Sequence, residues 1–127
     1  MSQPDIQNLG QISVGVQDLN RATAFYRDVL GLDHLFTVPP GLSFFMAGDV
    51  RLMLSLPEPS ADPAFLGTST LYFKVPSIEA AVSAIRTKTE VLDEPHLIAN
   101  MGDHELWMAF IKDSEGNALA FMEERPV

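Results

Sequence analysis

The sequence predicts an α+β fold made of two similar halves, and three observations support this prediction. Two segments have the apolar spacing of a helix, and each lies between runs that are typical of strands. Residues of similar type recur at a constant distance along the chain. A segment rich in proline and polar residues separates the halves. The predicted order of elements is therefore strand, helix, and two or three strands, given twice.

Both predicted helices have recognisable ends. In the first, Asp18 is expected to cap the free N–H groups, and Gly31 supplies the residue best suited to the left-handed conformation just past the helix. In the second, Ser77 is the expected cap. One apolar stripe marks the buried side of each helix: Ala22, Phe25, Tyr26 and Val29 in the first, and Ile78, Ala81, Val82 and Ile85 in the second.

The strands are predicted from their composition and from the turns between them. QISVGV (11–16) leads into the first helix, and TLYFKV (70–75) leads into the second. Residues 42–56 have the pattern of a hairpin that turns at Gly48 and Asp49. In the second half, residues 96–111 and then 118–123 complete the set, with the turn KDSEGN before the last strand.

The two halves agree in register. Val16 and Val75 are 59 positions apart, and Met53 and Ala120, on the last strand of each half, are 67 apart. Because neither half alone has enough apolar surface to bury both a sheet face and a helix stripe, we expect one domain over 1–127. Its parts are module one at about 9–56, a linker at about 57–68 and module two at about 69–124.

The composition limits the classes of partner. Seventeen acidic residues stand against eight basic ones, which gives a net charge of −9 and argues against nucleic acid as a partner. The chain has no cysteine, no secretory signal pattern and no apolar run long enough for a bilayer. We therefore expect a soluble cytoplasmic protein with no membrane partner.

Two phrases resemble a known family. DLNRATAFYRDVLGL in the first half and FIKDSEGN near the end are similar to segments of the vicinal oxygen chelate superfamily. That superfamily includes glyoxalase I, extradiol dioxygenases, and the fosfomycin and bleomycin resistance proteins. The resemblance covers about Leu9 to Glu124. It implies two βαβββ modules that pair into a curved mixed sheet around a cavity, with the helices on the outer face.

The resemblance also implies four strand positions that hold a divalent metal in many members. In this sequence these positions are Gln11, Met53, Thr70 and Ala120. The set contains no carboxylate and no imidazole, and a thioether is a poor match for Mg²⁺, Mn²⁺, Zn²⁺ or Fe²⁺. We therefore predict no metal and no other cofactor.

Strand alternation predicts which residues share a face with these positions. The predicted turn at 48–49 pairs Phe44 with Met53 and Met46 with Arg51. Large apolar residues take the opposite face, under the helices: Leu52, Leu54, Leu56, Leu71, Phe73, Val75, Leu119 and Phe121. The predicted ligand-binding residues line the cavity: Gln11, Arg51, Met53, Thr70, Tyr72, Phe110, Ala120 and Met122.

The three histidines and the only tryptophan are further candidates for chemistry. His34 is expected to be a solvated loop residue. His96 and His104 flank a hairpin next to Glu105, either as a small metal or acid–base cluster or as ordinary surface residues. Neighbours on a strand point to opposite faces, so His104 and Glu105 do not easily serve one site. Trp107 is expected in the core on the helix side.

The sequence favours metal-independent binding of a small organic molecule in the cavity, and it resembles the bleomycin-resistance branch most in its acidic character and lost ligands. Family members often build the cavity across a two-fold interface, which implies a homodimer. One alternative is a glyoxalase- or dioxygenase-like lyase or isomerase with a non-standard or absent metal site, in which His104, Tyr72 and Gln11 are the first acid–base candidates. Another is a structural or partner-binding domain whose cavity is filled by its own side chains.

Overall fold

Residues 3–57 and 69–127 are described by a computed structural model, in which the chain divides into two units, Met1–Pro59 and Ser60–Val127. Each unit contains one mixed four-stranded sheet and its own helical segment. The predicted α+β class and the repeated order of strand, helix and three strands are confirmed. Apart from Pro57, the predicted linker lies outside the described residues.

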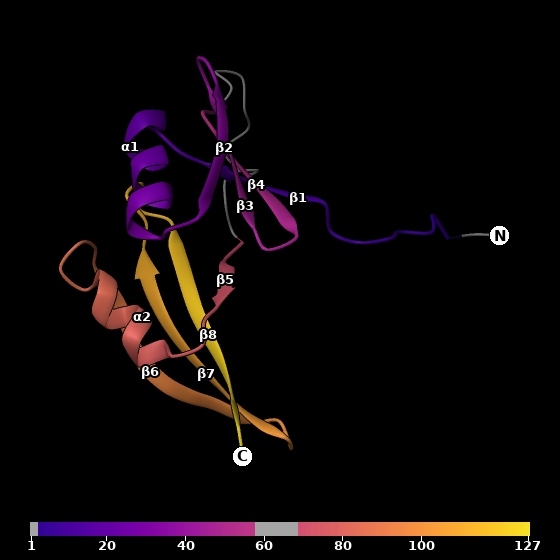
Figure 1. Ribbon diagram of the computed structural model, residues 1–127, viewed down its shortest axis with the longest axis vertical. Helices are drawn as coiled ribbons and strands as arrows, with labels where there is room; N and C mark the ends of the chain where they lie inside the picture. Colours follow the sequence, from indigo (N-terminus) through magenta and orange to yellow (C-terminus); the bar gives the residue numbers. More distant parts are fainter. Residues whose placement is uncertain (1–2, 58–68) are drawn as a thin grey trace. The chain divides into compact units, whose positions relative to one another are not determined.

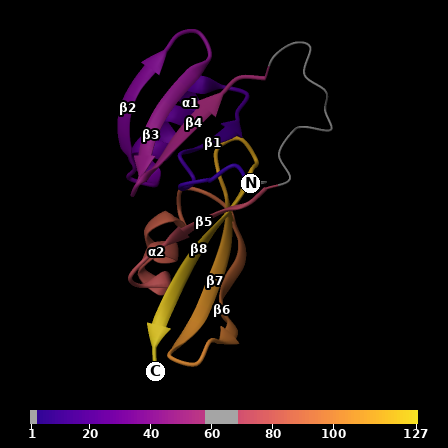
Figure 2. The same ribbon diagram turned by 90° about the vertical axis from the view of Figure 1, so that its right-hand side faces the viewer.

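The first unit forms a sheet in the order β1-β4-β3-β2, and Figure 2 shows these strands side by side. β1 runs parallel to β4, whereas β3 is antiparallel to both of its neighbours. The predicted turn is confirmed, since Gly48 (φ 60°) lies between β3 and β4. The elements are β1 (Gln11–Gly15), α1 (Leu19–Ala24), η1 (Phe25–Val29), β2 (Asp33–Val38), β3 (Leu42–Ala47) and β4 (Val50–Ser55).

The first helix begins as predicted but changes its winding part-way. The Asp18 carboxylate accepts from the Arg21 backbone N–H at 3.0 Å, which is the expected cap. After α1 the chain continues as the wider π-helical segment η1, closed by the Leu30 N–H donating to the Phe25 carbonyl at 3.0 Å. Phe25 and Tyr26 are both buried there, with their ring centroids 5.7 Å apart.

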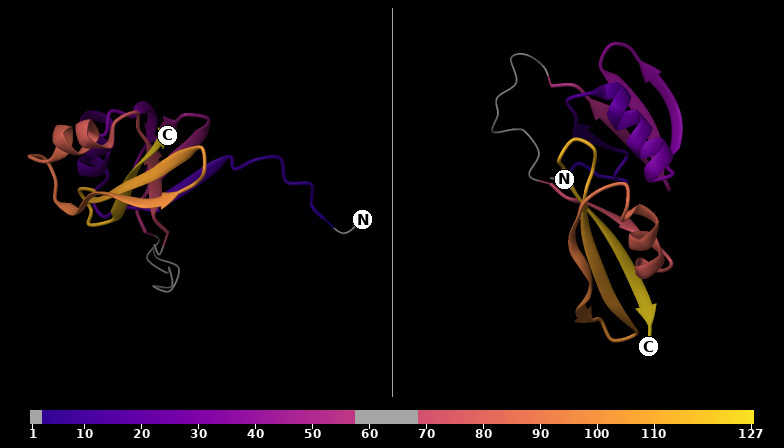
Figure 3. Two further views of the ribbon diagram at one scale, coloured as in Figure 1. Left: turned by 90° about the horizontal axis from the view of Figure 1, so that it is seen from below. Right: turned by 90° about the vertical axis from the view of Figure 1, so that its left-hand side faces the viewer.

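The core of the first unit lies between this helix and one face of the sheet. α1 contacts β3 and β4, and η1 contacts β2. Phe45, Leu52 and Leu54 are almost fully buried beneath it. The right-hand view of Figure 3 shows α1 lying across this face. No helix among the described residues of this unit packs on the other face of the sheet.

The second unit repeats the arrangement with longer strands. Its sheet has the order β5-β8-β7-β6, with β5 parallel to β8 and the rest antiparallel. Figure 1 shows α2 on one side of β7 and β8, and contacts join α2 to β6, β7 and β8. The elements are β5 (Leu71–Lys74), α2 (Ile78–Ile85), β6 (Val91–Asn100), β7 (His104–Lys112) and β8 (Ala118–Pro126).

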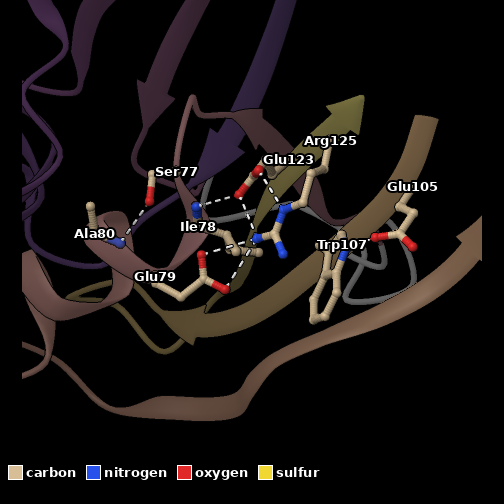
Figure 4. Close-up of polar contacts among 8 residues, drawn as sticks. All are labelled: Ser77, Ile78, Glu79, Ala80, Glu105, Trp107, Glu123 and Arg125. Carbon is tan, nitrogen blue, oxygen red and sulfur yellow. Dashed lines mark hydrogen bonds and ion pairs between the residues drawn. The ribbon is translucent and has the colours of Figure 1, made fainter. Parts of the chain in front are cut away.

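The start of α2 is held by two acceptors. The Ser77 hydroxyl accepts from the Ala80 N–H at 3.2 Å, which confirms the predicted cap. The buried Glu123 carboxylate, on β8, accepts from the Ile78 N–H at 2.8 Å (Figure 4). Glu123 also accepts from the Arg125 guanidinium at 2.9 Å, and Arg125 reaches Glu79 at 3.1 Å. These hydrogen bonds tie the helix to the last strand.

Trp107 lies beside this cluster rather than in the core. Its indole N–H donates to the Glu105 carboxylate at 3.1 Å, and the Arg125 guanidinium lies over its ring at 4.4 Å (Figure 4). The predicted helix-side orientation is confirmed, because Trp107 pairs with Glu123. The predicted core position is wrong, since the side chain is only half-buried. It lies in the first half of β7, with Arg125 over its ring, whereas Ala109 and Ile111 further along the strand are fully buried.

Neither of the described helices has the length and apolar character that crossing a membrane requires.

Candidate functional site

The open face of the first sheet brings three predicted site residues together. Gln11 on β1 pairs with Arg51 on β4, and Met53 follows Arg51 on the same face. The Arg51 Nε–H donates to the Gln11 Oε1 at 2.6 Å. The Gln11 Nε2 donates to the Met53 sulfur at 3.8 Å. The amide of Gln11 therefore bridges the guanidinium and the thioether, with both of its ends engaged.

Two aromatic rings lie beside this bridge. Phe44 on β3 pairs with Met53, as predicted, and its ring centroid is 5.9 Å from the Arg51 guanidinium carbon. Phe36 on β2 packs against Phe44 with a centroid separation of 4.8 Å. Phe36 is 51% exposed, which is unusual for a large apolar side chain on a sheet. We call these two rings the aromatic pair. Sequence reasoning missed Phe36, although its alternation with Val38 on the same face was a usable signal.

The open face of the second sheet collects four more of the predicted residues. Ala120 on β8 pairs with Tyr72 on β5 and with Phe110 on β7, and Met122 follows on β8. The rings of Tyr72 and Phe110 meet edge to face with centroids 6.1 Å apart. Ala120 is fully buried although it faces away from the helix. Since both ring-bearing residues are its direct partners across the strands, the two rings cover its methyl group.

A group of charged residues lies at the far end of the same face. Lys74 forms an ion pair with Glu124 at 2.7 Å, and His104 approaches the same carboxylate at 3.6 Å. The hydrogen bond from Lys74 lowers the pKa of Glu124 below its usual range. His104 also bonds Asp103 at 2.7 Å, and this hydrogen bond lowers the pKa of Asp103. These contacts neutralise charge locally, and sequence reasoning assigned no role to Glu124.

Thr70 is only loosely associated with this face. β5 begins at Leu71, so Thr70 lies one residue before the strand and outside its ladder. Strand parity places it on the side of Tyr72. The predicted strand at 70–75 is therefore shorter than expected at both ends.

The predicted histidine cluster does not assemble among the described residues. His104 faces Glu124, whereas Glu105 accepts from Trp107 on the opposite face. This confirms that His104 and Glu105 point to different sides. His96 bonds the Glu94 backbone carbonyl at 2.8 Å. Within residues 3–57 and 69–127, no three His, Cys, Asp or Glu side chains are grouped as metal ligands.

His34 was wrongly predicted as a solvated loop residue. It lies in β2, and its ring packs at a tilt against the buried Phe45 with centroids 4.9 Å apart. Its Nε2 is 3.0 Å from the Thr37 hydroxyl and 3.3 Å from that of Ser43. Ser43 is fully buried and accepts from Thr23 on α1 at 3.0 Å. The prediction failed because the chain forms a bulge between His34 and Phe36, which breaks the alternation that marks a strand.

The residues at the family's metal positions do not fit a divalent cation. Gln11 offers an amide oxygen, but that oxygen already accepts from the cationic guanidinium of Arg51. The hydrogen bond occupies one lone pair of this oxygen, and a metal ion on the other would meet the like charge of the guanidinium beside it. Met53, Thr70 and Ala120 supply a thioether, a neutral hydroxyl and a methyl group. This donor set provides no negative charge.

Comparison with known proteins identifies the family. The family described as Glyoxalase/Bleomycin resistance protein/Dioxygenase superfamily matches residues 8–121. The chain belongs to this superfamily. The resemblance predicted from the sequence is thereby confirmed at the level of the superfamily. A search of curated proteins found no match.

Several solved structures share the fold. A lactoylglutathione lyase from Agrobacterium tumefaciens is 23% identical with a TM-score of 0.75, covering 94% of this chain and 95% of its own. TnmS3, an antibiotic binding protein from Streptomyces sp. CB03234, is 21% identical with a TM-score of 0.73, covering 96% and 99%. A virulence protein from Salmonella typhimurium is 22% identical with a TM-score of 0.73, covering 93% and 97%. At these identities the likeness establishes the fold alone.

Proposed function

We propose that this member of the superfamily binds a small organic molecule without a metal ion, in the manner of the bleomycin-resistance-like proteins. The observation that carries the proposal is the hydrogen bond from Arg51 to Gln11. It places a cation beside Gln11, one of the four positions that the superfamily resemblance marks as metal ligands. Mixed polar and aromatic side chains remain on both open sheet faces, which suits recognition of a partly apolar molecule.

The ligand-contacting residues in this proposal are those predicted from the sequence. Gln11, Arg51 and Met53 lie on the open face of the first unit's sheet, and Tyr72, Phe110 and Met122 lie on that of the second. Thr70 and Ala120 belong to the same side of the second unit's sheet, where neither offers a charged group. The solved antibiotic binding protein TnmS3 supports the proposal as a member of the same fold with a binding function.

A thermal-shift screen followed by calorimetry tests binding directly. We expect aromatic compounds from such a screen to raise the midpoint of unfolding, because a ligand that binds only the folded state stabilises it. Tyr72→Ala and Phe110→Ala should each weaken a confirmed ligand about tenfold, since each removes a large apolar contact. Arg86→Gln is the matched control, because Arg86 pairs with Glu94 at the end of α2. Unchanged affinity in both aromatic variants would remove these faces from the function.

Metal analysis tests the other half of the proposal. Protein purified without chelators is expected to contain less than a stoichiometric amount of Mn, Fe, Ni or Zn. The triple variant Met53→Glu, Thr70→His and Ala120→Glu restores anionic and imidazole ligands and should bind one of these ions measurably. A stoichiometric ion held at Gln11 in the unaltered protein would instead favour the lyase or isomerase alternative.

We also propose that the protein works in the cytoplasm as a homodimer. The absence of cysteines is compatible with a reducing compartment. The outer strand β6 and the turn after it leave large apolar side chains exposed, namely Leu92, Leu97, Ile98 and Met101. Light scattering coupled to size-exclusion chromatography should give twice the chain mass, and Leu97→Lys with Ile98→Lys should reduce it to one chain.

A further inference from the structure

Arg51 differs from most other basic residues of the chain in its partners. The chain carries a net charge of −9, so a basic side chain has many acids available. Five others form ion pairs with carboxylates: Arg27, Lys74, Arg86, Lys112 and Arg125. Among the described residues of the first unit, no carboxylate is paired with Arg51, whose polar side-chain contact is the neutral amide of Gln11.

The guanidinium of Arg51 is nevertheless held in place. Its Nε–H is committed to Gln11 at 2.6 Å, and Gln11 is itself fixed by its contact with the Met53 sulfur at 3.8 Å. The Phe44 ring supports the guanidinium carbon at 5.9 Å. With Nε engaged, the two Nη groups form the remaining donor edge. This edge has the spacing that a carboxylate accepts in a bidentate pair.

An apolar surface adjoins this donor edge. The aromatic pair, Phe36 and Phe44, lies on the same face as Arg51, and Phe36 keeps half of its surface exposed. In contrast Phe45, the neighbour of Phe44, faces the helix and is fully buried. A flat ring placed on the aromatic pair would be within reach of the guanidinium at its edge.

We propose that the open face of the first sheet selects a planar aromatic molecule that carries a carboxylate, with the carboxylate on the Nη edge of Arg51 and the ring on the aromatic pair. This inference rests on the proposed binding function and specifies the class of its ligand. The charge it assigns to the ligand is negative, whereas the acidic net charge taken alone favours cationic ligands. The neutral partner of Arg51 decides between the two, because a guanidinium without a carboxylate attracts an anion and repels a cation.

Three probes with one ring system test the inference by calorimetry: 2-naphthoate, 2-naphthamide and 2-naphthylmethylammonium. In low salt we expect the full-length protein to bind 2-naphthoate about tenfold more tightly than 2-naphthamide, since a charged hydrogen-bonded pair is gained. The ammonium probe should bind more weakly still. The preference for the carboxylate should shrink in 0.5 M salt, because Arg51 is exposed.

Two variants connect the preference to the guanidinium. Arg51→Gln should bring the affinity for 2-naphthoate within about twofold of that for 2-naphthamide. Arg51→Lys keeps the charge but loses the two parallel N–H donors of the guanidinium, so it should retain part of the difference in affinity. Arg86→Gln should leave it unchanged. In ¹⁵N-labelled protein, the Nε–H signal of Arg51 and the ring protons of Phe36 should shift with 2-naphthoate, which reports on the site without relying on the variants.

The outcomes separate this inference from the proposed function. Equal binding of the three probes, or a carboxylate preference that survives in Arg51→Gln, overturns the assigned ligand class while binding itself stands. Failure of all three probes to bind at millimolar concentration overturns the assigned ligand class, whereas the proposed function fails only if the thermal-shift screen also finds no ligand. A tenfold preference that depends on Arg51 and shifts the signals of this face supports both.

Discussion

Met53 in the first unit and Ala120 in the second occupy the same place in their sheets. Met53 lies between Ser13 and Phe44, and Ala120 lies between Tyr72 and Phe110. In the first unit the thioether receives an amide N–H from a neighbouring strand. In the second, a methyl group is small enough for two rings to meet above it. One strand register therefore supports two different local chemistries.

The two open faces also differ in the positions of their charged residues. The place of Arg51 on β4 is taken on β8 by Ala118, and the place of Lys74 on β5 is taken on β1 by Gly15. Lys74 pairs with the carboxylate of Glu124, whereas the contacts of Arg51 within the described part of its unit are with a neutral amide and a ring. Lys74 thus has a carboxylate partner on the second face, and the described residues of the first unit give Arg51 none.

The two units also differ on the helix-facing sides of their sheets, where a polar residue in one corresponds to an apolar residue in the other. Thr23 and Ser43 share a buried hydrogen bond in the first unit, where the second has Val82 and Ala109 at the corresponding positions. Conversely, Glu123 in the second unit corresponds to Leu56 in the first. Each unit therefore has a buried polar interaction under its helix, at a different position in the sheet.

The largest effect is expected where the rings cover Ala120. Ala120→Glu should lower the free energy of unfolding by about 3 kcal/mol, because a carboxylate would lose its water between Tyr72 and Phe110 without gaining a partner. Urea denaturation at neutral pH measures this change. Ala118→Glu is the matched control, since Ala118 is exposed on the same strand and face, and it should cost less than about 0.5 kcal/mol. Equal tolerance of the two variants would show that the rings do not close over position 120.

The pairing of these residues was predictable from sequence because strand geometry has a strict period of two. Once the turn at Gly48 was placed, the partners of Met53 followed, and the repeat distances carried the same register to Ala120. The superfamily resemblance rested on the helix and turn phrases, which are local.

Other features depended on contacts that local patterns do not encode. His34 was predicted in a loop but lies in β2, where a bulge between His34 and Phe36 interrupts the alternation that marks a strand. The carboxylate of Glu123 caps a helix 45 residues earlier in the chain. The π-helical segment after Ala24 depends on the packing of Phe25 and Tyr26 rather than on helix propensity. Each of these is decided by tertiary packing.

The second-largest effect is expected at Glu123. Glu123→Gln should destabilise the protein by about 2 kcal/mol at pH 7, because the buried carboxylate accepts from both Ile78 and Arg125. Glu124→Gln, which alters the exposed neighbouring carboxylate, should cost less than about 0.5 kcal/mol. Thermal and urea unfolding of the two variants give the comparison. A larger loss for Glu124→Gln would contradict the assignment of the helix cap to Glu123.

The same carboxylate predicts how the stability responds to acid. The Arg125 guanidinium, followed by the Ile78 N–H, lowers the pKa of Glu123 in the folded protein. A lowered folded pKa contributes stability that is present above the unfolded value, about 4.3, and is lost as the pH falls through the folded pKa. The difference in unfolding free energy between the unaltered protein and Glu123→Gln should therefore be constant near neutrality and shrink below about pH 5. A difference that grew on acidification would reverse the sign and contradict the pairing.

The smallest effect is expected when the first unit is given the apolar pair of the second. Thr23→Val alone should cost about 1 kcal/mol, since it removes a buried hydrogen bond to Ser43. Adding Ser43→Ala removes the partner as well, and the double variant should return to within about 0.5 kcal/mol of the unaltered protein, because replacing both partners leaves no buried polar group unsatisfied. His34 and Thr37 contact Ser43 at 3.3 Å but retain their own 3.0 Å contact. A double-mutant cycle measures the coupling free energy between Thr23 and Ser43. If the two substitutions lowered the unfolding free energy additively, the hydroxyl pair would not be the polar counterpart of Val82 and Ala109.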